Sequence, residues 1–198
     1  MFHMEPARPV SKQPIPEHAH KVFSGVMFDV YQWQQEQFDG STTVFEKLAR
    51  PDTVVVFAVT EDQQIVLTKQ EQPGKEPFIG AAGGRVDKGE TPLAAAKREL
   101  IEETGYEAQE YTLWDARHPT SKIDWVVYTF IATGAKKVSE ITLDAGEKIS
   151  LQIVDFDTFL DIGTQQNFSE REIVPELYEA RLDPNKKTDL ASKFGIFT

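Results

Sequence analysis

The stretch GRVDKGETPLAAAKRELIEETGY, residues 84–106, decides the fold, because it joins a glycine-containing loop to a helix with clear start and stop signals. Thr91 suits the N-cap, and Pro92 suits the first helical position, where its missing N–H is not needed. Residues 93–104 are rich in Ala, Leu, Lys and Glu, which are good helix formers. Gly105 provides the stop. The sequence therefore predicts a loop followed by a helix that ends at residue 104.

Three carboxylates of this helix share one face. Glu99, Glu102 and Glu103 fall within about 100° of one another, since residues three and four apart are neighbours on a helix. Leu93 and Leu100 point away from them and predict the buried side. Like charges at this spacing weaken a helix by about 0.2–0.5 kcal/mol per pair, and carboxylates near its C-terminus also oppose the helix dipole. The face is therefore either a solvated acidic surface or a site for a cation.

The flanking residues decide between these two interpretations. Five residues separate a glycine from a glutamate, seven more separate that glutamate from an Arg-Glu pair, and two further glutamates and a glycine follow. The members are Gly84, Glu90, Arg98, Glu99, Glu102, Glu103 and Gly105. At average residue usage such a coincidence is expected on the order of once in 10⁸ starts. The pattern resembles the Nudix box at each of these positions, and only Tyr106 departs from it, where the family usually has an aliphatic residue.

Composition limits the classes of protein and partner. The 198 residues, 40% of them hydrophobic, suit one domain with an appendage or two small domains. With 32 acidic against 21 basic residues, a net charge of −11 and no basic stripe, we expect no nucleic-acid partner. The chain has no cysteine, which excludes disulfides and thiolate metal sites. No apolar run approaches about 18 residues, so we expect no membrane partner and a cytoplasmic location.

The first 21 residues contain four prolines and three histidines among few apolar residues, which predicts a flexible, extended lead-in. A metal site made of Glu17, His18 and His20 is the alternative. We favour the mobile tail, because a flexible segment rarely preorganises metal ligands.

The remaining chain alternates strand and turn signals before and after the box. Residues 22–30 and 42–49 are expected as strands around a turn at Asp39-Gly40. The run VVVFAV, residues 54–59, predicts a buried central strand. Further strands are expected at 65–68, 78–82, 111–117, 125–133 and 149–156, polar loops at 69–77 and 136–148, helices at 157–162 and 170–182, and then a polar tail.

Strands on both sides of the box helix, with more helix at the end, predict an α+β or α/β sandwich. The resemblance implies the Nudix α/β/α sandwich, a mixed β-sheet between helices, here with an N-terminal antiparallel β segment. We expect a lead-in at 1–21, the β segment at 22–50 and a Nudix hydrolase domain at 51–198. N-terminal segments in the resembling family commonly exchange contacts between subunits, so the resemblance implies a homodimer formed through residues 22–50.

The resemblance also implies a metal site. Carboxylate oxygens suit hard cations, Mg²⁺ or Mn²⁺. Family glutamates at the positions of Glu99 and Glu103 bind catalytic divalent metal, and the one matching Glu102 takes part in many members. Ala82 is assigned to the same metal set, and Glu102 and Glu103 are also expected to be catalytic.

The loop and the arginine are expected to support this site. The family's equivalent of Arg98 orients carboxylates by ion pairing, which places it among the catalytic residues, and Glu90 approaches the site or holds the loop. Gly83 and Gly84 allow the backbone to approach a ligand closely, and together with Arg85 they are the expected substrate contacts.

A general base is expected on the loop before the last strand, as in relatives that cleave ADP-ribose. Glu147 is our first choice, with Glu140 and Asp144 as alternatives. The metal would polarise a phosphorus centre and acidify an attacking water, so that a pyrophosphate bond breaks into two monophosphates.

The substrate expected is a small molecule linked to a nucleoside diphosphate. The extra N-terminal β segment, together with Pro119 and Asp124 soon after the box, resembles the ADP-ribose and nucleotide-sugar pyrophosphatase branch. Phe28, Tyr31 and Trp33 are candidates to stack on the base, but for each of them we favour core packing or a place in a dimer interface. Two alternatives are a housecleaning enzyme for nucleoside triphosphates and a nucleotide-binding module without catalysis.

Overall fold

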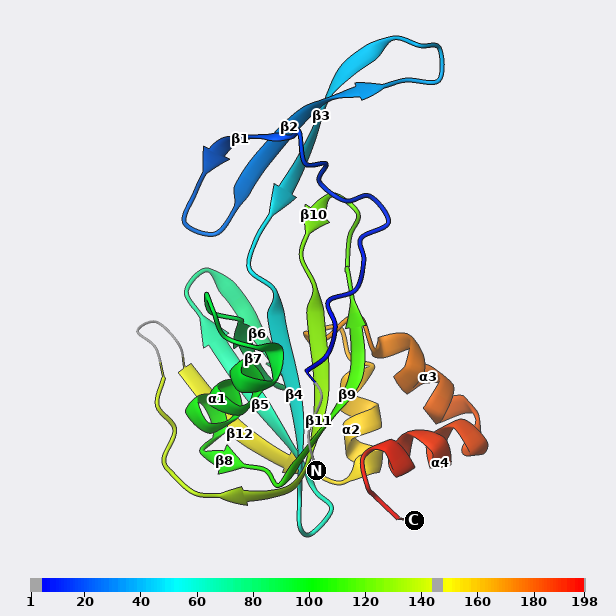
Figure 1. Cartoon of the computed structure of the whole chain (residues 1–198). Helices are drawn as coiled ribbons and strands as arrows, with labels where there is room; N and C mark the ends of the chain where they lie inside the picture. Colours follow the sequence, from blue (N-terminus) through cyan, green and yellow to red (C-terminus); the bar gives the residue numbers. More distant parts are fainter. Residues whose placement is uncertain (1–4, 144–147, 198) are drawn as a thin grey trace.

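The structure is a computed structural model that describes residues 5–143 and 148–197, and its centre is a mixed β-sheet (Figure 1). The strands are β1 (His20–Ser24), β2 (Asp29–Glu36), β3 (Thr42–Ala49), β4 (Thr53–Thr60), β5 (Ile65–Gln72), β6 (Lys75–Gly80), β7 (Ala82–Arg85), β8 (Tyr106–Glu107), β9 (Glu110–Arg117), β10 (Ile123–Asp124), β11 (Val127–Lys137) and β12 (Lys148–Val154). The helices are α1 (Pro92–Thr104), α2 (Phe156–Gly163), α3 (Val174–Leu182) and α4 (Pro184–Lys193). None of these helices is both long and apolar enough to cross a membrane.

The strand predicted at residues 54–59 is confirmed as the centre of this sheet. β4 lies between β5 and β11 in a sheet with the order β12-β5-β4-β11-β8, in which β6 also pairs with β5, β7 with β4 and β9 with β11. β4 runs parallel to β11 and antiparallel to β5 and β7. Because β4 has strand neighbours on both edges and helices over both faces, its apolar run needs no polar alternation.

Helices cover both faces of the sheet, with α1 on one side and α2, α3 and α4 on the other (Figure 1). Phe57 of β4 packs against Phe159 and Phe194, at ring-centroid distances of 5.5 and 6.2 Å. Its neighbour Val56 belongs instead to the core cluster that contains Leu100 of α1. Neighbouring residues of a strand point to opposite faces of the sheet, so Val56 and Phe57 belong to different core clusters. These layers confirm the predicted α+β class and the α/β/α sandwich.

The N-terminal antiparallel β segment differs from the prediction in its first strand. β1, β2 and β3 form consecutive neighbours of a second sheet, and β10 adds to β3 in parallel. The strand expected at 22–30 is wrong, because the chain turns inside it, where the Gly25 amide donates to the Phe28 carbonyl at 2.9 Å. The turn at Asp39-Gly40 is confirmed, with a φ of 83° at Gly40. Trp33 is buried in this sheet and packs on Phe45 with ring centroids 4.9 Å apart.

Two expected loops are in fact regular structure. The polar loop at 69–77 is wrong, since β5 continues to Gln72, turns at Gly74 with a φ of 76°, and returns as β6. The polar C-terminal tail is also wrong, because Asp183 caps α4 and Leu190 of that helix is buried. In both places the strand or helix buries so few apolar side chains that the pattern resembled a loop.

The described part of the lead-in, residues 5–19, forms no helix or strand and runs along the body of the protein (Figure 1). Arg8 pairs with Asp52 at 2.8 Å and with Asp124 at 3.1 Å. The buried Lys47 amine donates to the Ser11 hydroxyl at 3.1 Å. The segment is therefore extended, as expected, and its flexibility stays a prediction.

Candidate active site

The helix predicted from its end signals is confirmed as α1. Thr91 Oγ1 accepts a hydrogen bond from the Ala94 amide at 3.2 Å, and Pro92 starts the helix. Gly105 ends it with a φ of 72°, and its amide donates to the Ile101 carbonyl at 2.8 Å. Only glycine adopts this left-handed conformation without strain. Both ends of the acidic helix are thus fixed by local chemistry.

Glu103 ties α1 to β7. This residue is only 6% exposed, and its Oε2 accepts a hydrogen bond from the Gly83 amide at 3.0 Å. Gly83 must be glycine, because an ideal Cβ would lie 2.3 Å from the Val54 carbonyl oxygen on β4. A buried carboxylate needs such a donor, and the bond fixes where its oxygens lie.

Gly84 makes room for Glu99. An ideal Cβ on Gly84 would lie 2.2 Å from Glu99 Oε1, so the absence of a side chain leaves a cradle that this carboxylate fills. We expected the glycine to admit a ligand, and in the structure its immediate neighbour is a box carboxylate. Gly83 and Gly84 therefore bring β7 against the acidic face of α1.

Arg98 lies at the centre of the carboxylates. Its Nε and Nη2 each bond to Glu90 at 3.0 Å, and its Nη1 bonds to Glu99 at 2.7 Å and to Glu102 at 3.0 Å. Its Nη2 also donates to the Arg85 carbonyl at 2.9 Å. These bonds raise the pKa of Arg98, and the bond from Arg98 is the main reason that the pKa of Glu90 lies below its ordinary value. The guanidinium therefore offsets the self-repulsion of the acidic face.

A pocket of about 460 Å³ opens over this network. Its lining residues are Met27, Gln72, Gly83, Gly84, Arg85, Asp87, Arg98, Glu99, Glu102, Glu103 and Thr142. Three of them had no signal in the sequence: Met27 fell inside an expected strand, Gln72 inside an expected loop, and Thr142 in a polar run. The pocket joins the box to β5, to the turn between β1 and β2, and to the loop after β11.

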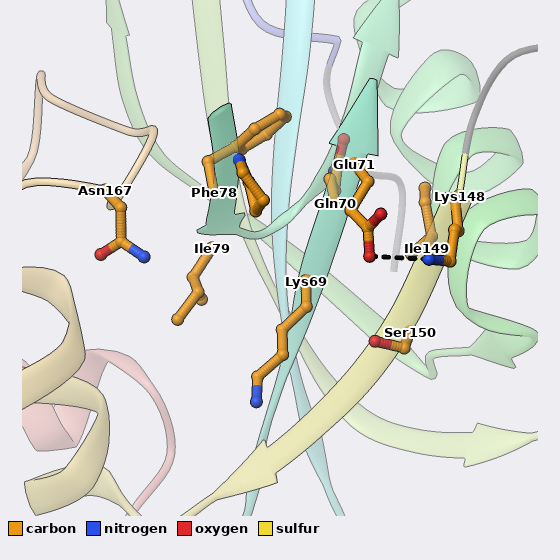
Figure 2. Close-up of a pocket in the computed structure, with 10 residues that line it drawn as sticks. Lys69, Gln70, Glu71, Phe78, Ile79, Lys148, Ile149, Ser150 and Asn167 are labelled. Carbon is orange, nitrogen blue, oxygen red and sulfur yellow. Dashed lines mark hydrogen bonds and ion pairs between the residues drawn. The ribbon is translucent and has the colours of Figure 1, made fainter. Parts of the chain in front are cut away.

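A second pocket of about 410 Å³ lies between β5, β6 and β12 (Figure 2). Glu71 pairs with Lys148 at 2.8 Å on one side of it, and Asn167 lies on the other. It shares no lining residue with the first pocket. The two pockets are therefore separate, and Glu99, Glu102 and Glu103 line only the first of them.

The structure describes only one of the three expected general bases. Glu147 and Asp144 lie outside the described residues. Glu140 is 96% exposed in its side chain and pairs with Lys137 at 3.9 Å, and it does not line the carboxylate pocket. Thr142 comes before Asp144 and Glu147 in the chain, and its amide donates to the Glu102 carbonyl at 2.8 Å. The loop is thus attached to the end of α1 where it approaches the pocket.

The other expected residues are spread over several environments. Ala82 is buried in β7 in the core cluster under α1. The Arg50 guanidinium lies over the Phe28 ring, 5.8 Å from the ring centroid. The Lys21 amine lies over the Tyr31 ring, 5.5 Å from its centroid. Asp124 pairs with the lead-in. None of these four lines the carboxylate pocket.

Comparisons with known proteins agree with this geometry. The model of the NUDIX domain matches residues 49–177. The chain belongs to the Nudix family. This Nudix protein is 31% identical over 145 residues to the ADP-ribose pyrophosphatase of Bacillus subtilis (strain 168), covering 72% of the chain and 78% of that relative. It is equally similar, 31% over 144 residues, to the methanol dehydrogenase activator of Bacillus methanolicus, covering 71% and 77%.

A third relative and a solved structure complete the comparison. The chain is 47% identical over 53 residues, 27% of its length and 34% of the relative's, to a putative 8-oxo-dGTP diphosphatase of Bacillus subtilis (strain 168). The crystal structure of an ADP compounds hydrolase has the same fold, with a TM-score of 0.68 and 22% identity over 88% of this chain and 95% of that one. The protein is therefore a Nudix hydrolase of the type that resembles ADP-ribose pyrophosphatases.

The donor set fits the divalent metal that Nudix hydrolases generally use. Glu99, Glu102 and Glu103 offer only carboxylate oxygens, which hard cations prefer. Within the described residues, no three acidic, histidine or cysteine side chains converge on a cation position as they stand. Arg98 Nη1 instead bonds to both Glu99 and Glu102. A cation would therefore replace the contacts of Nη1, while Glu90 keeps its two bonds to Arg98.

Proposed function

We propose that this Nudix hydrolase cleaves the pyrophosphate bond of ADP-ribose or of a nucleotide sugar, with Mg²⁺ or Mn²⁺ as cofactor, and releases two monophosphates. The observation that carries the proposal is the meeting of Glu99, Glu102 and Glu103 with the Gly83-Gly84 loop at one pocket. A pyrophosphate is repelled by bare carboxylates. It fits here only if cations and the neighbouring Arg85 and Arg98 offset the charge.

The residues of the chain have separate tasks in this reaction. Glu99, Glu102 and Glu103 would hold the metal, which would polarise a phosphorus centre and acidify the attacking water. The Gly83 amide fixes Glu103, and Arg98 Nη1 holds Glu99 and Glu102 until a metal takes over these contacts. The backbone around Ala82 completes the metal set in this proposal.

Glu147 is the proposed general base, with Asp144 and Glu140 as alternatives. In the sequence, Glu147 lies between Thr142, which lines the pocket, and Lys148, the first residue of β12. We expect Glu147→Gln to lower kcat by about 10²-fold with little change in KM, a size typical of general-base catalysis. A rate equal to wild type would return the role to Asp144 or to the box.

The extent of similarity supports an ADP-ribose-like substrate. The ADP-ribose pyrophosphatase of Bacillus subtilis matches 72% of the chain, far more than the box, whereas the 8-oxo-dGTP diphosphatase relative matches 27%. A housecleaning activity on nucleoside triphosphates is therefore the weaker alternative. A non-catalytic module is weaker still, because every box glutamate is present.

The test is direct competition between substrates. Purified protein is incubated in Mg²⁺ with ADP-ribose, GDP-mannose, UDP-glucose and dGTP, and products are identified by chromatography and mass spectrometry. The proposal expects two monophosphates from one of the first three at a higher kcat/KM than for dGTP. Faster release of pyrophosphate from dGTP, or no turnover of any of the four, would refute it.

The homodimer also belongs to this proposal. Val22, Phe23 and Val44 of the N-terminal sheet are 52%, 59% and 57% exposed, an apolar surface that a second copy would cover. Light scattering after size exclusion should give twice the mass of the 198-residue chain. A monomer at micromolar concentration would contradict dimerisation through residues 22–50.

A further inference from the structure

Glu170, between α2 and α3, is a buried carboxyl group outside the carboxylate pocket. It is only 9% exposed, and its Oε2 has no hydrogen-bond partner among the described residues. Burial raises the pKa of Glu170 to about 7, against weaker opposing effects of the Ser169 hydroxyl and the Ala81 backbone. Leaving a buried polar atom without a partner costs about 1–3 kcal/mol, so an apolar side chain would fill this place more favourably. The carboxyl group therefore calls for a role other than filling space.

The segment that carries Glu170 pairs with β6. The Ile79 amide donates to the Asn167 carbonyl at 3.0 Å, and the Ser169 amide donates to the Ile79 carbonyl at 2.9 Å, so residues 167–169 extend the sheet as a parallel neighbour. Ile79 and Asn167 both line the second pocket, as Figure 2 shows. The position of Glu170 is thus fixed relative to the strand that leads into the box.

Gly80, at the end of β6, makes room for the carboxyl group. An ideal Cβ on Gly80 would lie 2.1 Å from Ser169 Oγ and 2.6 Å from Glu170 Oε1. Its φ lies outside the left-handed region, so glycine is needed here for space alone. The Ser169 hydroxyl donates to Glu170 Oε1 at 2.6 Å. Gly80, Ser169 and Glu170 therefore pack closely against one another at the bend between β6 and β7.

The same bend is held from its other side and leads directly to the catalytic carboxylates. Thr68 Oγ1 lies 3.3 Å from the Ala81 carbonyl oxygen, and Gln70 Nε2 donates to Thr68 Oγ1 at 3.0 Å. Two residues beyond Ala81, the Gly83 amide donates to Glu103 Oε2 at 3.0 Å. Any shift of the bend therefore changes the geometry of Glu103.

We propose that Glu170 is a positioning residue for hydrolysis: it holds the bend at Gly80-Ala81 and, through the bend, the alignment of Gly83 with Glu103. This inference rests on the proposed function, which supplies the reaction. The alignment itself is a property of the chain and is measurable without substrate. Glu170 touches no substrate and acts only through the backbone.

The test uses Glu170→Gln and Gly80→Ala in the full chain, with Glu179→Gln, an exposed glutamate of α3, as the matched control. Glu170→Gln should lower kcat about tenfold while KM stays within about twofold. Hydrogen–deuterium exchange of residues 78–85, measured by mass spectrometry, should become about fivefold faster. Gly80→Ala should give the same two changes, because its Cβ displaces the carboxyl group without removing it.

A purely structural role predicts a different result. In that case urea unfolding would show lost stability while kcat and the exchange of residues 78–85 stay at the values of Glu179→Gln, and this outcome would overturn the proposal. A wild-type protein that cleaves no nucleoside diphosphate would refute the proposed function instead. The exchange measurement would still decide whether Glu170 holds the bend.

Discussion

The buried carboxyl group of Glu170 should make the protein less stable as the pH rises, and Glu170→Gln should remove that dependence. Burial raises its pKa from the ordinary 4.5 to about 7 in the folded protein. A group whose pKa is raised on folding contributes stability that is fully present below its unfolded pKa of 4.5 and is lost as the pH rises through about 7.

The size of the effect follows from these two pKa values. A difference of one between the folded and unfolded pKa corresponds to about 1.4 kcal/mol of unfolding free energy. The difference in unfolding free energy between wild type and Glu170→Gln should therefore change by about 3 kcal/mol between acidic and mildly alkaline pH. Other carboxylates act in the opposite direction. The pKa of Glu90 is lowered by Arg98, so its contribution is lost as the pH falls. Subtracting the variant from the wild type cancels such shared terms.

The assay is urea unfolding of wild type, Glu170→Gln and the control Glu179→Gln at five values from about pH 4.5 to 8.5, with EDTA present so that metal binding does not contribute. The wild type should lose stability relative to Glu170→Gln between about pH 4.5 and 7, and the difference should level off above that. A free-energy difference that stays constant with pH, or one that grows in favour of the wild type at high pH, would refute the reasoning.

Three further predictions concern the carboxylate pocket. Glu103→Gln should lower kcat by about a thousandfold, roughly 4 kcal/mol of barrier, while circular dichroism shows a retained fold, and near-normal turnover would remove Glu103 from the metal site. Mg²⁺ at about one hundred times its Kd should raise the unfolding free energy by about 2.7 kcal/mol in urea titrations, and an unchanged midpoint would mean that the folded protein does not bind it. Gly84→Ala should weaken Mg²⁺ binding in calorimetry, because its Cβ would lie 2.2 Å from a Glu99 oxygen, and wild-type affinity would show that the cradle is not needed.

Much of the fold could be predicted from local signals. Thr91, Pro92 and Gly105 mark the ends of α1 because capping is a matter of a few adjacent residues. The VVVFAV run marks the central strand because only a strand buried on both faces tolerates it. The missed elements lack such signals. β1 has every side chain exposed, and α4 buries few, so neither has an apolar face that a pattern could detect.

The site could be predicted only where its residues lie in one continuous motif. The box gave Glu99, Glu102, Glu103 and Arg98 together, and the structure brings them to one pocket. Met27 reaches that pocket through the turn between β1 and β2, which depends on long-range packing. Residues 170–182 were expected as one helix, but α3 begins only at Val174. The irregular segment before it, which carries the buried Glu170, has no periodicity of its own.

The acidic face of α1 was expected to weaken its own helix until a cation arrived, and Arg98 changes that expectation. One guanidinium bonds to Glu90 through Nε and Nη2 and to Glu99 and Glu102 through Nη1, which a lysine ammonium with its single nitrogen cannot reproduce. The chain itself therefore offsets part of the self-repulsion of this helix before any metal binds. A cation that took over Glu99 and Glu102, as we propose, would leave the paired bonds of Arg98 to Glu90 in place, so the loop before α1 would keep its anchor. Metal binding would then exchange one partner of Glu99 and Glu102 for another.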